Sequence, residues 1–288
     1  MLTSDIVIQV LISGLLIGLV FSLVAIGLTL IYGVMDIVNF AHGEFLMLSM
    51  YIAFWMWTLW GVDPIFSIPI CTAALFLLGV FIYKSLISRI MNAPMLAQIF
   101  ATFGLMVFLQ SAAFFLWKGD YRMISGSMFS GRVEFMGAFI GIPQMIAALG
   151  SIVTTGAVAL LINFTELGRA LRATAEDREA AALMGINTEW VFAFSWGLGS
   201  ACVGVAGALL SIFYPIFPLV GGVFVITAFV VVVLGGFGSI AGAFIAGIVV
   251  GLIQVISGFF VAPTFKLVFV YAIYLLVVFI RPKGLMGK

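Results

Sequence analysis

Four polar side chains lie close together in the stretch YGVMDIVNFAHGEF, between two apolar runs of the sequence. They are Asp36, Asn39, His42 and Glu44, and His42 is the only histidine of the chain. Where ionisable side chains lie within a membrane, they usually line a pathway, gate it or relay protons. The alternative is a structural role, in which these residues break a helix and hold an interface. The residue types alone leave the alternatives open.

A catalytic or metal-binding role finds no support elsewhere in the sequence. A zinc hydrolase would need a pattern such as H-E-x-x-H, and nucleophilic catalysis would need a base beside a nucleophile; the sequence shows neither. Cys71 and Cys202 lie far apart in apolar stretches, so we interpret both as small buried hydrophobic side chains. We therefore expect neither an enzyme nor a chain that binds a metal or another cofactor.

The second concentration of polar residues is ELGRALRATAEDREAAALMGINTEW, residues 166–190. It holds eight charged side chains, although only 8% of the whole chain is charged. Thr174 and Asp177 form a variant of the capping box that starts a helix. Residues 175–184 favour a helix, and Gly185 suits the left-handed residue that ends one. These features predict a surface helix of about ten residues, too short and too polar to cross a bilayer.

Such a helix could bind a partner protein. Its alanines allow close approach, and Arg178 and Glu179 offer charge for orientation. An isolated helix of about ten residues is marginally stable, so we expect a partner to complete it. The alternative is an ordinary solvated loop.

The elements that position these residues are membrane-spanning helices. Hydrophobic residues make up 65% of the chain, whereas soluble domains contain about 45–50%. Because lipid offers the backbone no hydrogen-bond partners, each apolar run of roughly 20 residues is predicted to be a helix. The runs lie at 6–32, 43–60, 64–84, 95–117, 139–163, 191–214, 217–236, 238–259 and 264–281.

We therefore expect an all-α polytopic bundle of about nine spans, within a range of roughly eight to ten, as a single domain over residues 1–288. The least secure pair is 217–236 and 238–259. These two runs meet at Gly235, Gly236 and Gly238, and they could form one broken or re-entrant element.

The distribution of Lys and Arg predicts the orientation, because short loops rich in these residues stay in the cytoplasm. With nine alternating spans, one side carries Lys84, Arg89, Arg169, Arg172, Arg178, Arg281, Lys283 and Lys288. The other side carries Lys118, Arg122, Arg132 and Lys266. The amino terminus is then outside, and the carboxyl terminus and residues 166–190 are inside. The stretch from Asp36 to Glu44 is placed near the cytoplasmic mouth, where water is available, so we expect mainly a structural role for it.

Two sequence patterns concern how the helices pack. ISGLLIGLVFSLVAIGLTLIYG and, about 180 residues later, WGLGSACVGVAGALLSIFYP each end in an aromatic-rich break and open a set of four spans. This indicates an inverted repeat of four plus four helices, unless the likeness is only compositional. Glycines recur at Gly238, Gly242, Gly247 and Gly251. They favour close helix packing over direct substrate contact. The spans show no charge deep in the membrane, so we expect a largely apolar pathway.

Four stretches together resemble a known family. Glu179-Ala180-Ala181, followed after three residues by Gly185, is similar to the coupling-helix signature EAA-x-x-x-G of ABC importer permeases. LGRALRATAEDREAAALMGIN around it, GLTLIYGVMDIVNFAHGEFLMLSMY, VVVLGGFGSIAGAFIAGIVVGL and the closing RPKGLMG resemble the branched-chain amino-acid permease family. The I-x-L-P ending of the broader signature is absent after Gly185. Met286 stands where the family often has an aromatic residue.

The resemblance implies the transmembrane permease subunit of an ABC importer in a bacterial cytoplasmic membrane. A related permease subunit, two ATP-binding subunits and an external binding protein would complete it. ATP and Mg²⁺ would bind to the ATP-binding subunits, since no phosphate-binding loop G-x-x-x-x-G-K-[ST] occurs here. The residues expected to couple to the ATPase are Arg172, Asp177, Arg178, Glu179, Ala180, Ala181 and Gly185. Those expected at a pathway or gate are Asp36, Asn39, His42, Glu44, Gly238 and Gly242.

Alternatives remain for the substrate and the energy source. Similar permeases import urea, short amides or other amino acids. An ion-gradient transporter would need paired charges near mid-membrane, and the sequence shows none. The loop KGDYRMISGSMFSGRVE, residues 118–134, could meet the binding protein by charge complementarity or could be simply solvated.

Overall fold

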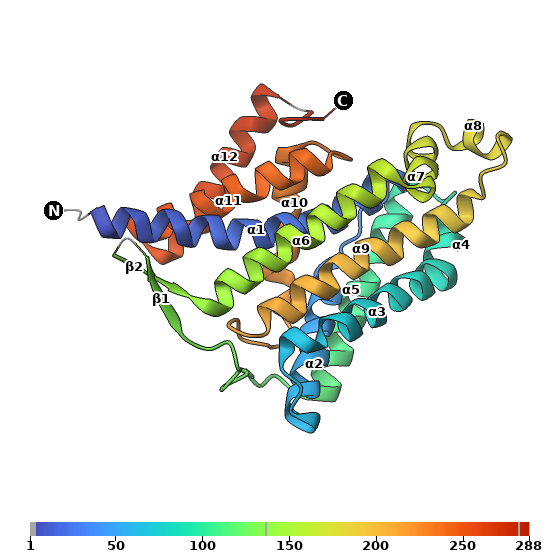
Figure 1. The fold of residues 1–288 in the computed structure, drawn as a ribbon. Coiled ribbons are helices and arrows are strands. Elements are labelled where there is room, and N and C mark those ends of the chain that lie inside the picture. The colour runs from blue at the N-terminus through green and yellow to red at the C-terminus, as the bar shows by residue number, and fades with distance from the viewer. Residues whose placement is uncertain (1–3, 136, 282, 288) are drawn as a thin grey trace.

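The computed structural model describes residues 4–135, 137–281 and 283–287. Its helices are α1 (Ser4–Met35), α2 (His42–Trp60), α3 (Pro64–Ile82), α4 (Ser88–Ile90), α5 (Met95–Trp117), α6 (Ile142–Phe164), α7 (Glu166–Glu176), α8 (Arg178–Leu183), α9 (Thr188–Leu210), α10 (Val220–Gly235), α11 (Ile240–Phe260) and α12 (Lys266–Ile280) (Figure 1). A π-helical turn, Tyr83–Ile87, joins α3 to α4, and a 3-10 turn, Pro263–Phe265, precedes α12. The predicted all-α polytopic bundle is confirmed.

One small sheet interrupts the helices. Strands β1 (Arg132–Phe135) and β2 (Ala138–Gly141) pair antiparallel, with Arg132 opposite Gly141. The predicted start of a span at residue 139 is wrong, because residues 138–141 continue the hairpin and α6 starts at Ile142.

The nine predicted apolar runs all contain helices, but they differ in their ability to cross a membrane. Among the described residues, seven helices are long and apolar enough to span a bilayer. Helix α10 has only 16 residues, and α2 carries His42 and Glu44 in its first turn. The runs 217–236 and 238–259 form two separate helices, α10 and α11. A turn with positive φ at Gly236 and Gly238 joins them.

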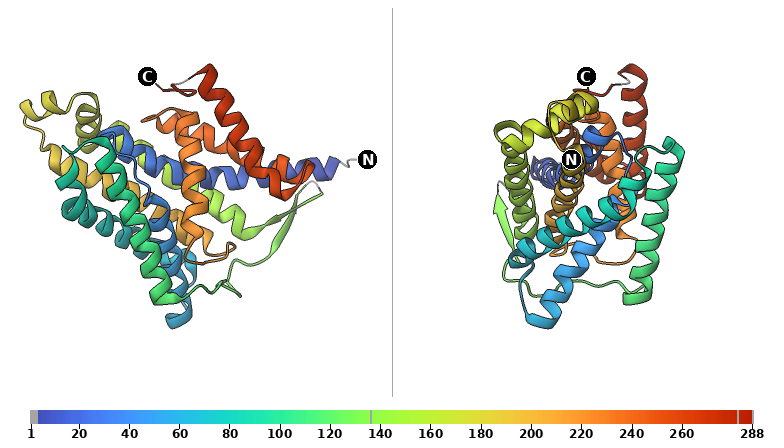
Figure 2. Two further views of the ribbon diagram at one scale, coloured as in Figure 1. Left: turned by 180° about the vertical axis from the view of Figure 1, so that it is seen from behind. Right: turned by 90° about the vertical axis from the view of Figure 1, so that its right-hand side faces the viewer.

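The helices lie between two opposite ends of the molecule. Figure 2 shows the start of α1 and the hairpin at one end, and α7 and α8 at the other. We call these the hairpin end and the arm end. Helix α4 also lies near the arm end (Figure 1).

The two halves of the predicted inverted repeat are α1, α2, α3 and α5 in one set and α9, α10, α11 and α12 in the other. Helices of each set pack against helices of the other set. Helix α1, the first of one set, packs along α11, the third of the other set. Helix α9, the first of the second set, packs along α3, the third of the first. Helix α2 likewise contacts α9, and α10 contacts α1. This reciprocal pattern favours the inverted repeat over a compositional likeness of single helices.

Small residues bring α1 and α11 into backbone contact. A Cβ atom at Gly14 would lie 2.9 Å from the Cα of Leu252, and one at Gly18 would lie 2.8 Å from the Cα of Ile248. The Ser22 hydroxyl donates to the carbonyl oxygen of Phe244 at 2.8 Å. The pairing runs antiparallel and uses Gly247, one of the repeated glycines. Close packing of this kind holds helices together where lipid already surrounds apolar side chains.

Helices α2 and α10 both begin inside the bundle. The α1 helix ends at Met35, yet His42 at the start of α2 contacts the carbonyl oxygen of Val24 at 3.0 Å. The chain between them must therefore turn back along α1. At the start of α10, Gly221 lies against Gly43, and a Cβ atom on either glycine would collide with the carbonyl oxygen of the other. The first turns of α2 and α10 therefore meet.

The closing RPKGLMG stretch packs against the other end of α10. The Leu285 amide donates to the carbonyl oxygen of Leu234 at 2.8 Å, and the Met286 amide donates to that of Gly235 at 3.0 Å. These bonds satisfy carbonyl groups that the end of a helix leaves without partners.

The α1–α11 contact makes a prediction about stability. We expect Gly247→Ala to destabilise the protein by about 1–3 kcal/mol, because the new Cβ atom would lie 2.6 Å from the backbone of Ser22. Gly156→Ala in α6 is the matched control, since its Cβ atom would meet no atom within 4 Å. Thermal unfolding in detergent measures both variants. Equal melting temperatures for the two would contradict the proposed contact.

Candidate functional site

The arm, residues 165–187, projects from the end of α6 and returns to α9. Thr165 starts α7 by accepting a hydrogen bond from the Gly168 amide at 3.0 Å. Gly168 lies so close to the carbonyl oxygens of Leu161 and Ile162 that a Cβ atom there would collide with them. The Arg172 guanidinium donates to the carbonyl oxygen of Ile162. These contacts fasten α7 to the end of α6.

The predicted single helix from 175 to 184 is wrong. Asp177 has an extended backbone, with φ of −154° and ψ of 109°, and it divides the segment into α7 and α8. Its carboxylate accepts hydrogen bonds from the amides of Glu179 and Ala180, both at 2.9 Å, so it caps α8. Thr174 is buried within α7 and starts no helix. The strong cap at Asp177 decides where α8 begins, and Thr165 caps the preceding helix.

The predicted role of Gly185 as a helix-ending residue is confirmed. Its φ of +84° is in the left-handed region that favours glycine. The Ile186 amide donates to the carbonyl oxygen of Ala181 at 3.1 Å, and the Gly185 amide donates to that of Ala182 at 3.0 Å. This pair of bonds is the Schellman motif.

The tip of the arm combines exposed apolar and charged side chains. Ala181 is the only buried residue of α8. Leu183 is 89% exposed and Met184 is 83% exposed. The Arg178 guanidinium lies 5.0 Å from the centre of the Phe192 ring, a contact that positions the start of α8 beside α9. An exposed apolar tip on a rigid turn can insert into a groove of another protein.

The second group of predicted site residues is divided between surface and interior. Asp36 is exposed and has a positive φ of 56°, so it marks the end of α1. Asn39, His42 and Glu44 are fully buried. The expectation that this stretch has water available is wrong for these three, because the chain after α1 turns inward before α2 begins. The prediction that the spans carry no charge deep in the membrane is therefore wrong, because ionisable groups lie in the bundle interior.

Each of these buried residues makes a defined hydrogen bond. The Asn39 side-chain oxygen accepts from the Ala41 amide at 3.1 Å, just before α2. The His42 Nε2 atom faces a carbonyl oxygen, so it carries a proton there. The Glu44 carboxylate accepts from the Gln110 side-chain amide at 2.9 Å. Gln110 was not among the predicted site residues, although it is a polar residue within an otherwise apolar run.

Glu44 joins three helices. It belongs to α2, its partner Gln110 belongs to α5, and a Cβ atom at Gly221 in α10 would lie 2.8 Å from the Glu44 Oε1 atom. The carboxylate thus lies in the first turn of α2 and beside the first turn of α10, where the positive ends of helix dipoles favour negative charge. This arrangement can hold α2, α5 and α10 in one relative position.

Gly238 and Gly242 serve the turn between α10 and α11. Gly238 has a φ of +76° and packs near Gly33 of α1, and Gly242 packs against the backbone of Gly235. The Ser239 hydroxyl accepts from the Gly242 amide at 3.1 Å and caps α11. These contacts favour helix packing over substrate contact. Within the described part of the chain, no three His, Cys, Asp or Glu side chains gather as metal ligands would.

Comparisons with known proteins agree along almost the whole chain. The model of a family described as "branched-chain amino acid transport system / permease component" matches residues 10–278. The chain belongs to this family. Membership makes it a multi-pass transport subunit of the membrane rather than an enzyme. The resemblance to this family is thereby confirmed.

Three relatives illustrate the similarity to this permease family. LivH of Salmonella typhimurium, named a high-affinity branched-chain amino acid transport system permease protein, is 32% identical over 304 residues, covering 97% of this chain and 95% of LivH. BraD of Pseudomonas aeruginosa, with the same description, is 31% identical over 293 residues with the same coverage. A probable LivH of Methanocaldococcus jannaschii is 31% identical over 255 residues, covering 84% of this chain and 78% of that protein. No solved structure matches the chain.

The cap at Asp177 yields a prediction about local stability. Asp177→Ala should destabilise α8 by about 0.5–2 kcal/mol, because two amides lose their hydrogen-bond acceptor. Hydrogen exchange at residues 178–184 should become faster, while the melting temperature of the bundle stays the same. Glu176→Ala, one residue away and exposed, is the control. Unchanged exchange in the Asp177 variant would show that the cap does not hold α8.

The Glu44–Gln110 pair yields a second prediction. Glu44→Ala should destabilise the protein by about 1–3 kcal/mol, since it leaves the Gln110 amide without its acceptor in the bundle. Glu44→Gln has nearly the same shape and keeps an acceptor oxygen, so it should recover most of that loss. Thermal unfolding of both variants in detergent tests this. If Glu44→Gln is destabilised as much as Glu44→Ala, the carboxylate charge rather than the hydrogen bond holds the helices.

Proposed function

We propose that the chain is the membrane-spanning subunit of an ATP-driven importer of branched-chain amino acids. The observation that supports this most is the family match over residues 10–278 together with relatives named for branched-chain amino acid transport. The exposed, rigidly capped arm supports coupling to a separate motor subunit. We propose the bacterial inner membrane as its location, with the amino terminus outside and the carboxyl terminus inside.

The proposed complex contains three kinds of partner subunit. A paralogous permease subunit pairs with this chain, and two ATP-binding subunits dock on the arm end. ATP and Mg²⁺ bind to those subunits. An external solute-binding protein delivers the amino acid at the hairpin end.

The arm is the proposed receiver of mechanical work. Leu183 and Met184 insert into a groove of an ATP-binding subunit, and the charges of Arg178 and Glu179 orient the contact. Asp177 and Gly185 fix both ends of α8, so the docked tip moves as a unit. Arg172 fastens α7 to α6. The short side chain of exposed Ala180 permits close approach of the partner, whereas buried Ala181 lets α8 pack closely against its own chain. Closure of the two ATP-binding subunits then displaces the arm.

Movement of the arm reaches the bundle through α9. This helix follows the arm directly and is buried along almost its whole length. It packs against α1, α2 and α3. We propose that Asn39, His42 and Glu44 form a gate where the first turns of α2 and α10 meet. Asp36 marks the arm-end opening of that gate, and Gly238 and Gly242 form its hinge.

Reconstitution tests this function. Proteoliposomes that contain the complete complex and its binding protein should accumulate leucine only when ATP reaches the ATP-binding subunits. The combined variant Leu183→Asp, Met184→Asp should lower uptake and co-purification of those subunits by about tenfold or more, because interface anchors carry most of the binding energy. Its melting temperature should not change, since both side chains are exposed.

The control for the arm is Ala175→Asp, an equally polar change at an exposed position of α7. It should keep uptake and association. Leucine accumulation by the purified chain alone, driven by a sodium or proton gradient, would contradict the ATP-driven function. Unchanged association of the tip variant would contradict the docking role of α8.

A further inference from the structure

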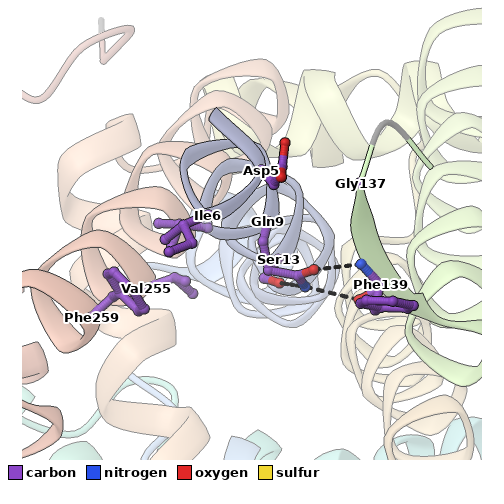
Figure 3. A pocket seen from close by; sticks show the side chains of 9 residues that line it. Asp5, Ile6, Gln9, Ser13, Gly137, Phe139, Val255 and Phe259 are labelled. Carbon is purple, nitrogen blue, oxygen red and sulfur yellow. Dashed lines mark hydrogen bonds between the residues drawn. The ribbon is translucent and has the colours of Figure 1, made fainter. Parts of the chain in front are cut away.

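The hairpin end holds three adjoining hollows that share Ser13 in their linings. Two of them, of about 360 Å³ each, lie beside the hairpin. Figure 3 shows one of these, between Asp5 and Gln9 of α1, Gly137 and Phe139 of the hairpin, and Phe259 of α11. The third, of about 530 Å³, lies between α1, α10 and α11, and we call it the chamber. The hollows therefore lead from the hairpin into the bundle.

The walls of the chamber are mostly apolar. Phe21 of α1, Phe224 of α10 and Tyr214 between α9 and α10 line it together with aliphatic side chains. Its volume lies in the range of about 300–1,000 Å³ that is typical of small-molecule sites. Such walls suit an aliphatic group of the ligand.

A few polar groups in the chamber indicate which class of ligand it would bind. Among the described residues that line it, Lys266, exposed at the start of α12, is the only charged one, and none carries a carboxylate. Thr227 and Gln254 also line it. The side-chain oxygen of Gln254 is buried and accepts no hydrogen bond within the described part of the chain. A cation and a free acceptor oxygen on apolar walls match a zwitterion with an aliphatic side chain.

The Gln9 side chain fastens the hairpin beside this entrance. The Gln9 side-chain amide donates to the carbonyl oxygen of Phe139 at 2.9 Å and accepts from the Phe139 amide at 2.6 Å (Figure 3). Gln9 therefore pairs with β2 as a neighbouring strand would. The entrance to the hollows has a defined shape as a result.

We propose that the chamber receives the amino acid on the hairpin side, before it passes through the bundle. The ammonium group of Lys266 binds the carboxylate of the amino acid, Gln254 and Thr227 accept hydrogen bonds from its ammonium group, and the aromatic walls contact its branched side chain. This inference rests on the proposed function, because it supplies the transport substrate with a site within this chain.

Filling the chamber tests the proposal. Val223 lines the chamber and is 43% exposed, whereas Ile226 on the same helix is 51% exposed and lies outside the lining. In proteoliposomes with the complete complex, Val223→Trp should lower leucine uptake by about tenfold or more, and Ile226→Trp should leave it within about twofold. Equal uptake by the two variants would overturn the proposal.

The charge is tested separately. Lys266→Gln should raise the leucine concentration needed for half-maximal uptake by about tenfold, and Lys266→Arg should restore it, because both Lys and Arg bind carboxylates. Uptake that is equal for Lys266→Gln and Lys266→Arg would show that the cation does not act on the substrate.

A direct measurement of occupancy completes the test. Val223→Cys can be labelled with a thiol reagent, because both native cysteines, Cys71 and Cys202, are buried. Leucine should slow this labelling, and lysine at the same concentration should not. Labelling that leucine leaves unchanged would overturn the proposal. Wild-type complex without ATP-dependent uptake would instead indicate failure of the proposed function, so the two failures are distinguishable.

Discussion

The structure depends on the fact that two helices, α2 and α10, begin inside an apolar bundle. The first turn of a helix leaves amide groups without partners, and lipid or apolar side chains cannot supply any. Asn39 and Glu44 place polar oxygens at the start of α2, and the Glu44 carboxylate also lies beside the start of α10. Gly43 and Gly221 let the two backbones approach closely enough to place the Glu44 carboxylate beside both first turns. The buried polar residues are therefore a consequence of how the chain enters α2.

The same arrangement connects the two sets of helices. Each set contributes one helix that starts in the interior, and the two starts touch. Helices α1 and α9 pass beside this point, and each packs along a helix of the other set. Since α9 also continues from the arm, a displacement at one end of the molecule has a short path of buried contacts to its centre. Between tightly packed helices, such a displacement is taken up by rigid movement rather than by local deformation.

The amino-acid sequence predicts the helices far better than their depth. Apolar runs identify nine helices, because length and composition alone decide whether a segment can lie in lipid. They do not reveal that α2 starts beside Val24, since that depends on a turn of six residues and on the glycines that permit it. For the same reason, the alternation of spans places Glu44 near water, whereas it is fully buried.

In the arm, one end of α8 could be predicted from the sequence and the other could not. Gly185 could be predicted because only a few residues tolerate its backbone conformation. The start of α8 could not be placed from Thr174, since Asp177 three residues later is an equally good cap and also interrupts the preceding helix. Gln110 and the chamber lie beyond local patterns altogether, because helices distant in the sequence assemble them.

The glycine face of α1 has a consequence for biogenesis. Its partner α11 begins more than 200 residues later. Gly14 and Gly18 are therefore synthesised long before Gly247 and Gly251. Until α11 is made, the glycine face of α1 has no partner helix to pack against. Packing of the first half is thus completed only after synthesis of the second, so a truncated chain would leave the glycine face of α1 without its partner helix.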